Sequence, residues 1–377
     1  SAPKLNRAKG RVYTGRNESR PPPSVIFFPF PGARTASVSE RKVNLMPLTV
    51  SDYKAPGWCP GSHLQTVIPA RVTPRPKVTY RREILETPDG DVVAWDWVTP
   101  EPADPRVPVL IHFHGLEGAS DSHYAEALMH ECVRRGWRGV VAHYRTCGGL
   151  MNRKPRAYFA GDTEDNLWVL KTVRDRFPEA PRYAVGVSLG GNQLSKCLGD
   201  IGHEASGLVA AAVSVCAPLD LVAGSERISK GMNILYANMF LETLKKKLEV
   251  KARMFPDVIR STDVARCRNM FDFDEIYTSR VHGFRSAMEY WQKCSAKNVL
   301  ANVRVPLLVL NAQNDPFLPA WSLPKESEVA SSVTLDYPKD GGCGFPRRES
   351  LPGGTHLPAG ARLALFRKPE VEFGPLF

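Results

Sequence analysis
Apolar residues are spaced along the central part of the chain as short strands that alternate with helices. Residues 77–87 and 92–98 alternate apolar and polar positions on either side of the turn at 88–91, which predicts a β-hairpin. Further on, continuous apolar runs are typical of strands buried on both faces of a sheet. These runs cover residues 107–113, 138–143, 183–187, 208–216, 303–311 and 332–337.

Segments whose apolar residues have the spacing of an α-helix separate most of these strands. Between residues 220 and 301 the alternation stops, and long helical stretches rich in lysine, methionine and aromatic residues follow one another. Strands that alternate with helices in this way predict a parallel sheet with helices on both faces. We therefore expect an α/β fold in which residues 220–301 form an inserted helical lid. The other helices are predicted at residues 122–135, 163–176, 193–198 and 321–329.

The strand at 183–187 runs into the sequence Gly186-Val187-Ser188-Leu189-Gly190. A G-x-S-x-G segment between a strand and a helix is typical of a nucleophile elbow, a sharp turn that lifts the serine hydroxyl clear of the sheet. The backbone amide of Leu189, at the start of the following helix, can point at a developing oxyanion. Ser188 is therefore the candidate nucleophile, although a glycine-rich turn with an incidental serine has the same pattern.

Two loops that follow other strands contain residues suited to the same chemistry. His114-Gly115-Leu116 comes directly after the strand at 107–113, where the amide of Leu116 can supply a second oxyanion donor. His114 itself is expected to order this turn rather than to transfer protons. Asp315 follows the strand at 303–311, in the order Ser then Asp, and can orient an imidazole. An Asp before a Pro is also a common turn former, so both roles are open for Asp315.

The net charge of +11 is concentrated at the start of the chain. Residues 1–50 contain nine lysines and arginines and two glutamates, a balance of +7, which leaves +4 for the other 327 residues. Because basic and aromatic residues are not interleaved, no nucleic-acid partner is expected. We predict that residues 1–52 are a basic, proline-rich tail without a fold of its own. Three roles stay open for it: a solvated tail, an organelle-targeting segment, or a segment that contacts a membrane surface.

The eight cysteines are scattered and include no C-x-x-C pair. Cys216 lies inside an apolar run, where a free buried thiol is ordinary. Such thiols favour a reducing compartment, so we expect a cytoplasmic protein. The spacing predicts no metal site, and no cofactor is expected. No apolar run approaches the ~20 residues that a membrane-spanning helix requires.

A series of short motifs is distributed over about residues 53–345. They are His63-Leu64-Gln65-Thr66, HGLEG at 114–118, Arg145-x-Cys147-x-Gly149, Gly161-Asp162-Thr163-Glu164-Asp165, GVSLGGN at 186–192, His282-Gly283-Phe284 and NDPF at 314–317. In this order they resemble the YheT-like branch of the α/β-hydrolase superfamily. The resemblance implies an α/β-hydrolase fold with a mostly parallel eight-stranded sheet, helices on both faces and a helical lid.

The same resemblance implies an activity and a set of site residues. The activity would be hydrolysis of carboxylic esters, with lipid-like acyl esters prominent. Ser188 would be the nucleophile, Asp315 the acid, and the amides of Leu116 and Leu189 the oxyanion hole.

The catalytic histidine of that family is missing from its usual place. Family members carry it in a GGHxGF segment after the last strand, where this chain has Gly341-Gly342-Cys343-Gly344-Phe345. Cys343 is a poor substitute, because a thiol with a pKa near ~8.5 is mostly protonated at neutral pH and cannot relay a proton toward Asp315. Of the nine histidines, only His356 lies beyond Asp315 in the sequence. His356 is therefore the candidate general base, in an unusual position.

The sequence favours two functions over a nucleic-acid or membrane-surface protein that uses the basic tail. The first is a serine hydrolase that acts on ester or lipid substrates such as acylglycerols or phospholipids, with His356 as its base. The second is a catalytically impaired relative that binds an acyl lipid or a protein partner through the same pocket and lid. The domain would end near residue 345, since prolines and glycines break residues 346–377 into an irregular tail.

Overall fold

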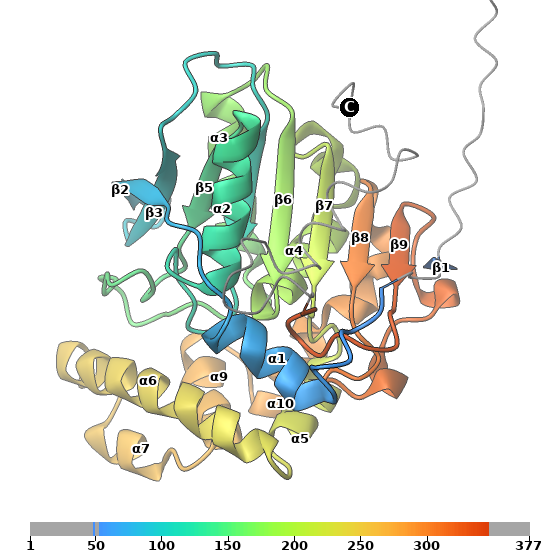
Figure 1. Cartoon of the computed structure of the whole chain (residues 1–377). Helices are drawn as coiled ribbons and strands as arrows, with labels where there is room; N and C mark the ends of the chain where they lie inside the picture. Colours follow the sequence, from blue (N-terminus) through green and yellow to red (C-terminus); the bar gives the residue numbers. More distant parts are fainter. Residues whose placement is uncertain (1–47, 50–52, 347–377) are drawn as a thin grey trace, which may run out of the picture. The chain divides into compact units, whose positions relative to one another are not determined.

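The computed structural model describes residues 48–49 and 53–346. Within these residues a sheet of nine strands has the order β1-β9-β8-β7-β6-β4-β5-β3-β2 (Figure 1). β2 pairs antiparallel with β3, and β3 with β5, while every other pair is parallel. The strands are β1 (Leu48–Thr49), β2 (Thr79–Glu86), β3 (Val92–Thr99), β4 (Val109–Phe113), β5 (Arg138–Ala142), β6 (Arg182–Val187), β7 (Ala211–Val215), β8 (Leu307–Leu310) and β9 (Val333–Asp336).

The strands β2 to β9 confirm the mostly parallel sheet that the sequence predicts. The ninth strand, β1, comes from the segment assigned to the basic tail and pairs with β9, with Leu48 opposite Leu335. The rest of residues 1–52, to which the basic tail is assigned, lies outside the described residues. The predicted boundaries at residues 52 and 345 therefore stay predictions.

The helices also follow the predicted alternation. They are α1 (Ser62–Arg71), α2 (His123–Arg135), α3 (Thr163–Arg176), α4 (Leu189–Ile201), α5 (Leu221–Ile228), α6 (Asn233–Met254), α7 (Ser261–Arg266), α8 (Met270–Phe273), α9 (Ser279–Val281) and α10 (Ala287–Cys294). None of the helices within the described residues combines the length and the apolar character needed to cross a bilayer.

One predicted helix is wrong. Residues 321–329 form two short 3-10 turns, Ala320–Ser322 and Glu326–Glu328, instead of a continuous helix. Pro324 lies between the two turns. Proline lacks the backbone N–H that an α-helix needs and its ring crowds the preceding turn, which disfavours a continuous helix across this position.

The two faces of the sheet explain the continuous apolar runs. Ile111 of β4 packs in a buried cluster with Leu170 of α3 and Leu194 of α4. Its neighbour Leu110 packs in a second cluster with Leu128 of α2. Successive side chains of a strand point to opposite faces, and here helices cover both, so every residue of β4 is buried.

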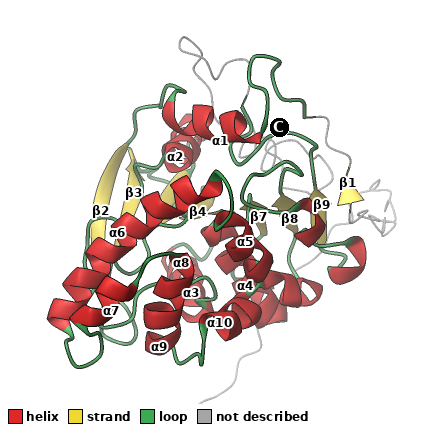
Figure 2. Ribbon diagram, turned by 90° about the horizontal axis from the view of Figure 1, so that it is seen from below, coloured by secondary structure: helices red, strands yellow, loops and turns green. Residues whose placement is uncertain are grey.

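Helices α5 to α10 come from the insertion predicted at residues 220–301. Figures 1 and 2 show α6, α7, α9 and α10 beyond the carboxyl ends of the parallel strands. α6 packs against α7 and α8 through a buried cluster that includes Leu248, Val264 and Phe273. The lid therefore has a small core of its own and lies over the edge of the sheet where the strands end.

A buried ionic network holds the loop that follows β5. The guanidinium of Arg145 is 1% exposed and contacts the carboxylates of Asp89, Asp91 and Asp165 at 3.0, 2.8 and 2.6 Å. Burial alone would raise the pKa of Asp89, but hydrogen bonds from Arg145 and Thr87 lower it well below its usual range. The network joins the β2–β3 turn and the first turn of α3 to this loop.

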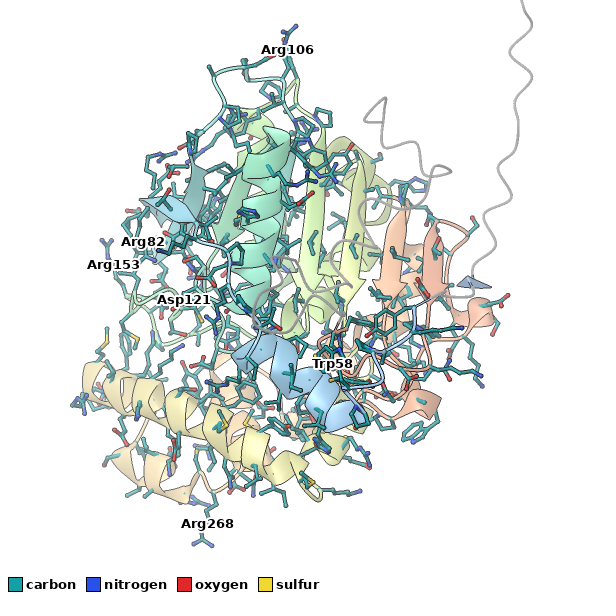
Figure 3. All side chains as sticks on the ribbon, in the orientation of Figure 1. Trp58, Arg82, Arg106, Asp121, Arg153 and Arg268 are labelled. Atoms are coloured by element: carbon teal, nitrogen blue, oxygen red, sulfur yellow. The ribbon has the colours of Figure 1, made fainter. Side chains whose placement is uncertain are left out.

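Surface ion pairs do not have this role. Arg106, in the loop before β4, points away from the ribbon in Figure 3 and pairs with Asp104 in solvent. Exposed pairs of this kind contribute little to stability because water screens both charges.

Candidate active site
Ser188 lies in the sharp turn between β6 and α4. Its backbone has φ 54° and ψ −122°, a conformation that residues with a side chain rarely adopt. The Ser188 N–H donates to the carbonyl of Val215 on the adjacent strand β7 at 2.8 Å, and the N–H of Gly191 donates to the Ser188 carbonyl at 2.9 Å. Surrounding hydrogen bonds therefore hold the strained turn in place, as the G-x-S-x-G motif predicts.

The two glycines of the motif are required by close backbone contacts. A Cβ on Gly186 would lie 2.3 Å from the carbonyl oxygen of Gly190, and a Cβ on Gly190 would lie 2.3 Å from the carbonyl oxygen of Phe113. The second contact brings the end of β4 against the start of α4. The loop at 114–118 is thereby placed beside Ser188.

His114 has a structural role in that loop. Its Nδ1 is 2.8 Å from the carbonyl oxygen of Gly115, and its Nε2 accepts from the N–H of Tyr144 at 3.3 Å. Burial holds the pKa of His114 well below its usual value, so the ring is neutral at physiological pH. Both ring nitrogens are engaged, which agrees with the predicted role of ordering the turn.

Glu117 joins the same loop to the lid, a link for which the sequence has no signal. The Tyr158 hydroxyl donates to Glu117 Oε1 at 2.8 Å and accepts from the Glu117 N–H at 3.0 Å. Lys247 Nζ, on α6, donates to the same Oε1 at 2.8 Å. The position of Leu116, the neighbour of Glu117, therefore depends on a helix more than one hundred residues further along the chain.

A cavity of about 570 Å³ opens over the elbow. Ser188, Leu116 and Leu189 all line it, so the candidate nucleophile and both candidate oxyanion residues lie together. The lid contributes mainly apolar and aromatic side chains to the same cavity. They include Leu221, Ile228, Phe240, Leu244, Leu248, Phe273 and Tyr277.

Asp315 lies in the loop after β8 and is 3% exposed. The N–H of Phe317 donates to its Oδ1 at 2.8 Å, whereas its buried Oδ2 has no hydrogen-bond partner among the described residues. Burial raises the pKa of Asp315 to about 7. The loop therefore leaves one buried carboxylate oxygen of Asp315 available for a partner.

The candidate base, His356, lies outside the described residues. Among the described histidines, His123 is the one that lines the cavity, at the start of α2. Burial lowers the pKa of His123 to about 4, which makes it a weak base. It also forms no hydrogen bond with Asp315 Oδ2, so the described residues contain no imidazole oriented by Asp315.

Two cysteines lie beside Asp315 instead. The side-chain ligand atoms of Cys216, Asp315 and Cys343 all lie within 4.8 Å of one another. Cys216 and Cys343 also line the cavity over Ser188. Both thiols are free, and contact with Cys343 together with burial holds the pKa of Cys216 well above its usual value. Spacing along the chain gives no indication of this cluster, because its members follow three different strands.

Comparison with known proteins identifies the family to which this chain is similar. The model of the alpha/beta hydrolase fold matches residues 108–332. YheT of Escherichia coli (strain K12), whose name describes an esterase, is 37% identical over 282 residues, which cover 74% of this chain and 82% of that protein. Phospholipase ABHD3 of Mus musculus is 31% identical over 287 residues, or 74% of this chain and 69% of that protein. Monoacylglycerol lipase of Saccharomyces cerevisiae is 28% identical over 254 residues, or 62% of this chain and 55% of that protein.

Proposed function
This chain belongs to the alpha/beta hydrolase fold family, and we propose that it hydrolyses carboxylic esters of acyl lipids such as acylglycerols or phospholipids. The observation that carries the proposal is the strained Ser188 at an apolar cavity, beside the loop of Leu116. The relatives' names point to the same chemistry, since they describe an esterase, a phospholipase and a monoacylglycerol lipase.

In the proposed mechanism Ser188 Oγ attacks the ester carbonyl. The amides of Leu116 and Leu189 donate hydrogen bonds to the oxyanion, which lowers the barrier most because these donors are already in place. His356 accepts the serine proton and returns it to the leaving alcohol, and water then cleaves the acyl-enzyme by the same route. Positioned general-base catalysis of this kind contributes ~10²–10⁴-fold to the rate.

The unpartnered oxygen of Asp315 supports the role given to His356. A buried acceptor without a hydrogen bond costs about 1–3 kcal/mol, and an imidazole N–H directed at Oδ2 would remove that cost. The same contact would fix the tautomer of the imidazole so that its other nitrogen faces Ser188. His356 is the one histidine that follows Asp315 in the sequence, so it is the residue assigned to this contact.

Labelling of the full chain with a fluorophosphonate tests the proposal. We expect labelling of the wild type, none in Ser188→Ala, and a labelling rate lowered ~10²–10⁴-fold in His356→Ala. His203→Ala, a change at an exposed position next to α4, is the matched control and should label like the wild type. Undiminished labelling of His356→Ala would show that another group is the base.

The segment Gly341-Gly342-Cys343-Gly344-Phe345 favours a second function, because it has no histidine where the family carries its base. No described residue bonds to Asp315 Oδ2, so a chain whose His356 does not reach it has no activated serine. Such a protein would bind an acyl lipid in the cavity without turnover. A wild type that fails to label but retains a radiolabelled acylglycerol on gel filtration would support this alternative over the hydrolase.

A further inference from the structure
Cys216, Asp315 and Cys343 form a three-residue cluster at the carboxyl edge of the sheet. They follow β7, β8 and β9, three adjacent parallel strands whose ends meet at that edge. Cys216 and Asp315 are buried, and Cys343 is half-buried at the cavity wall. Their ligand atoms, two sulfurs and a carboxylate oxygen, lie within 4.8 Å of one another.

We propose that Cys216 Sγ, Cys343 Sγ and Asp315 Oδ2 bind a Zn²⁺ ion beside Ser188, and that the bound ion inhibits the hydrolase. Zn²⁺ takes thiolate and carboxylate ligands at ~2.3 and ~2.1 Å, so the ligand atoms of one tetrahedral site lie roughly 3.5–4 Å apart. Ligand atoms that all lie within 4.8 Å of one another are close to that spacing.

The free oxygen of Asp315 is the observation that points to a ligand. A carboxylate in a side chain that is 3% exposed ordinarily has a partner for each oxygen, and Oδ2 has none among the described residues. Two thiolates and a carboxylate bring three negative charges to the site. A divalent cation offsets most of that charge, and the two thiols and the protonated fraction of the Asp315 carboxyl release their protons to solvent as the metal–ligand bonds form.

Backbone contacts hold the ligands in position. The Cys216 N–H donates to the Leu310 carbonyl at 2.9 Å, and the Cys343 N–H donates to Thr66 Oγ1 at 3.0 Å. These hydrogen bonds fix the two main-chain segments from which the cysteine side chains extend. Three protein ligands also leave a fourth tetrahedral position, which water can fill, and both cysteines line the cavity over Ser188.

Inhibition follows from competition for one oxygen, and this part rests on the proposed function. If Asp315 Oδ2 is bound to Zn²⁺, it cannot orient the imidazole of His356. Ser188 then loses its activated base. Removal of the ion would restore the pairing of Asp315 with His356 and with it the activity.

Metal binding is tested without any measurement of activity. The full chain with Ser188→Ala, freed of metals by a chelator and kept reduced with a phosphine, is titrated with Co²⁺. We expect one equivalent to bind with a thiolate-to-cobalt absorption band that Zn²⁺ removes. The band should disappear in Cys216→Ser and in Cys343→Ser, and Asp315→Asn should weaken Co²⁺ binding by at least about tenfold.

Cys267→Ser is the matched control, because Cys267 is a free buried cysteine after α7, in the lid cluster. It should keep the band, and thermal unfolding shows whether each variant is folded. An unchanged band in the folded double variant Cys216→Ser/Cys343→Ser would overturn the site.

Inhibition is then measured on the wild type as ester hydrolysis with and without Zn²⁺. We expect an at least tenfold lower rate with Zn²⁺, restored by a chelator, and no such effect in Cys216→Ser or Cys343→Ser relative to each variant's own metal-free rate. A cobalt band in a protein that never hydrolyses esters would contradict the proposed function, and the inhibitory role with it, but would support the metal site. Hydrolysis without any cobalt band would contradict the zinc site alone, and activation by Zn²⁺ would overturn the inhibitory role.

Discussion

At the scale of single residues, the backbone conformation of Ser188 depends on neighbouring glycines, which have no side-chain carbon. Ser188 keeps an unfavourable backbone conformation because the turn around it is held by hydrogen bonds to β7 and α4. Gly186, Gly190 and Gly115 allow three backbone segments to meet around it, since a Cβ on Gly115 would lie 3.3 Å from the Ser188 Cβ. A small change in volume at these positions therefore acts directly on the nucleophile.

Gly186→Ala tests this dependence. The new Cβ would lie 2.3 Å from the carbonyl oxygen of Gly190, a backbone atom that cannot rotate away. We expect a loss of about 1–3 kcal/mol in the free energy of unfolding, measured with urea, and a much slower reaction with a fluorophosphonate. Gly207→Ala is the matched control, because no atom lies within 4 Å of its added Cβ. Equal stability and labelling of the two variants would contradict the steric account.

At the scale of elements, the lid does more than cover the cavity. Helix α6 contributes Lys247, whose Nζ bonds to Glu117 in the loop that also carries Leu116. Tyr158 bonds to the same carboxylate from the segment before α3. Glu117 has a left-handed backbone, with φ 55°, so this loop needs such contacts to keep its shape. The lid thereby helps to place a candidate oxyanion donor.

Lys247→Met should therefore act on turnover. The Glu117 carboxylate would lose its cation, the loop would shift, and the Leu116 amide would be less well aligned with the oxyanion. Loss of an oxyanion donor costs ~10²–10³-fold in kcat, and we expect a misaligned one to cost about tenfold, with a smaller change in KM. Ester hydrolysis gives both constants.

Two further variants make the prediction about Lys247 specific. Lys246→Met alters the neighbouring exposed lysine and should leave kcat unchanged. Lys247→Arg keeps the cation and should restore most of the lost turnover. A Lys247→Met variant that changes KM alone would show that this lysine contacts the substrate and does not position the loop.

At the scale of the whole molecule, the cavity is built from parts that are far apart in the sequence. The sheet edge supplies Ser188 and Cys216, and the lid supplies apolar side chains such as Leu244 and Phe273. An apolar lining in the cavity of the nucleophile favours substrates with a hydrocarbon chain, because each methylene removed from water stabilises the bound state.

The length of the acyl chain should therefore control the rate. Each buried CH₂ is worth about 0.8 kcal/mol, so kcat/KM for p-nitrophenyl esters should rise about fourfold per methylene from acetate upward. The rise should stop once the chain fills the cavity of about 570 Å³. Leu244→Trp, which narrows the lid side, should move the optimum to shorter chains. Equal kcat/KM for all chain lengths would contradict binding of the acyl group in this cavity.

Local patterns in the sequence predicted most of the fold and part of the site. Strand and helix periodicity depends on which faces are buried, so β4, α3 and the elbow could be predicted without knowledge of their partners. The G-x-S-x-G motif predicted Ser188 from local sequence as well, because the turn needs glycine beside the serine whatever surrounds it. The incorrect prediction of a helix at 321–329 also has a local cause, since Pro324 interrupts the helix despite the helical spacing of the residues around it.

The sequence by itself determined the strands and the elbow. It also determined that Cys343 stands where the family carries its histidine. Tertiary structure alone decided which distant residues meet. Parallel strands bring their carboxyl ends to one edge, which places Cys216 and Cys343 beside Asp315. The lid folds back over that edge, which places Lys247 on Glu117. Spacing along the chain predicts neither contact, because both depend on strand order and helix packing rather than on local periodicity.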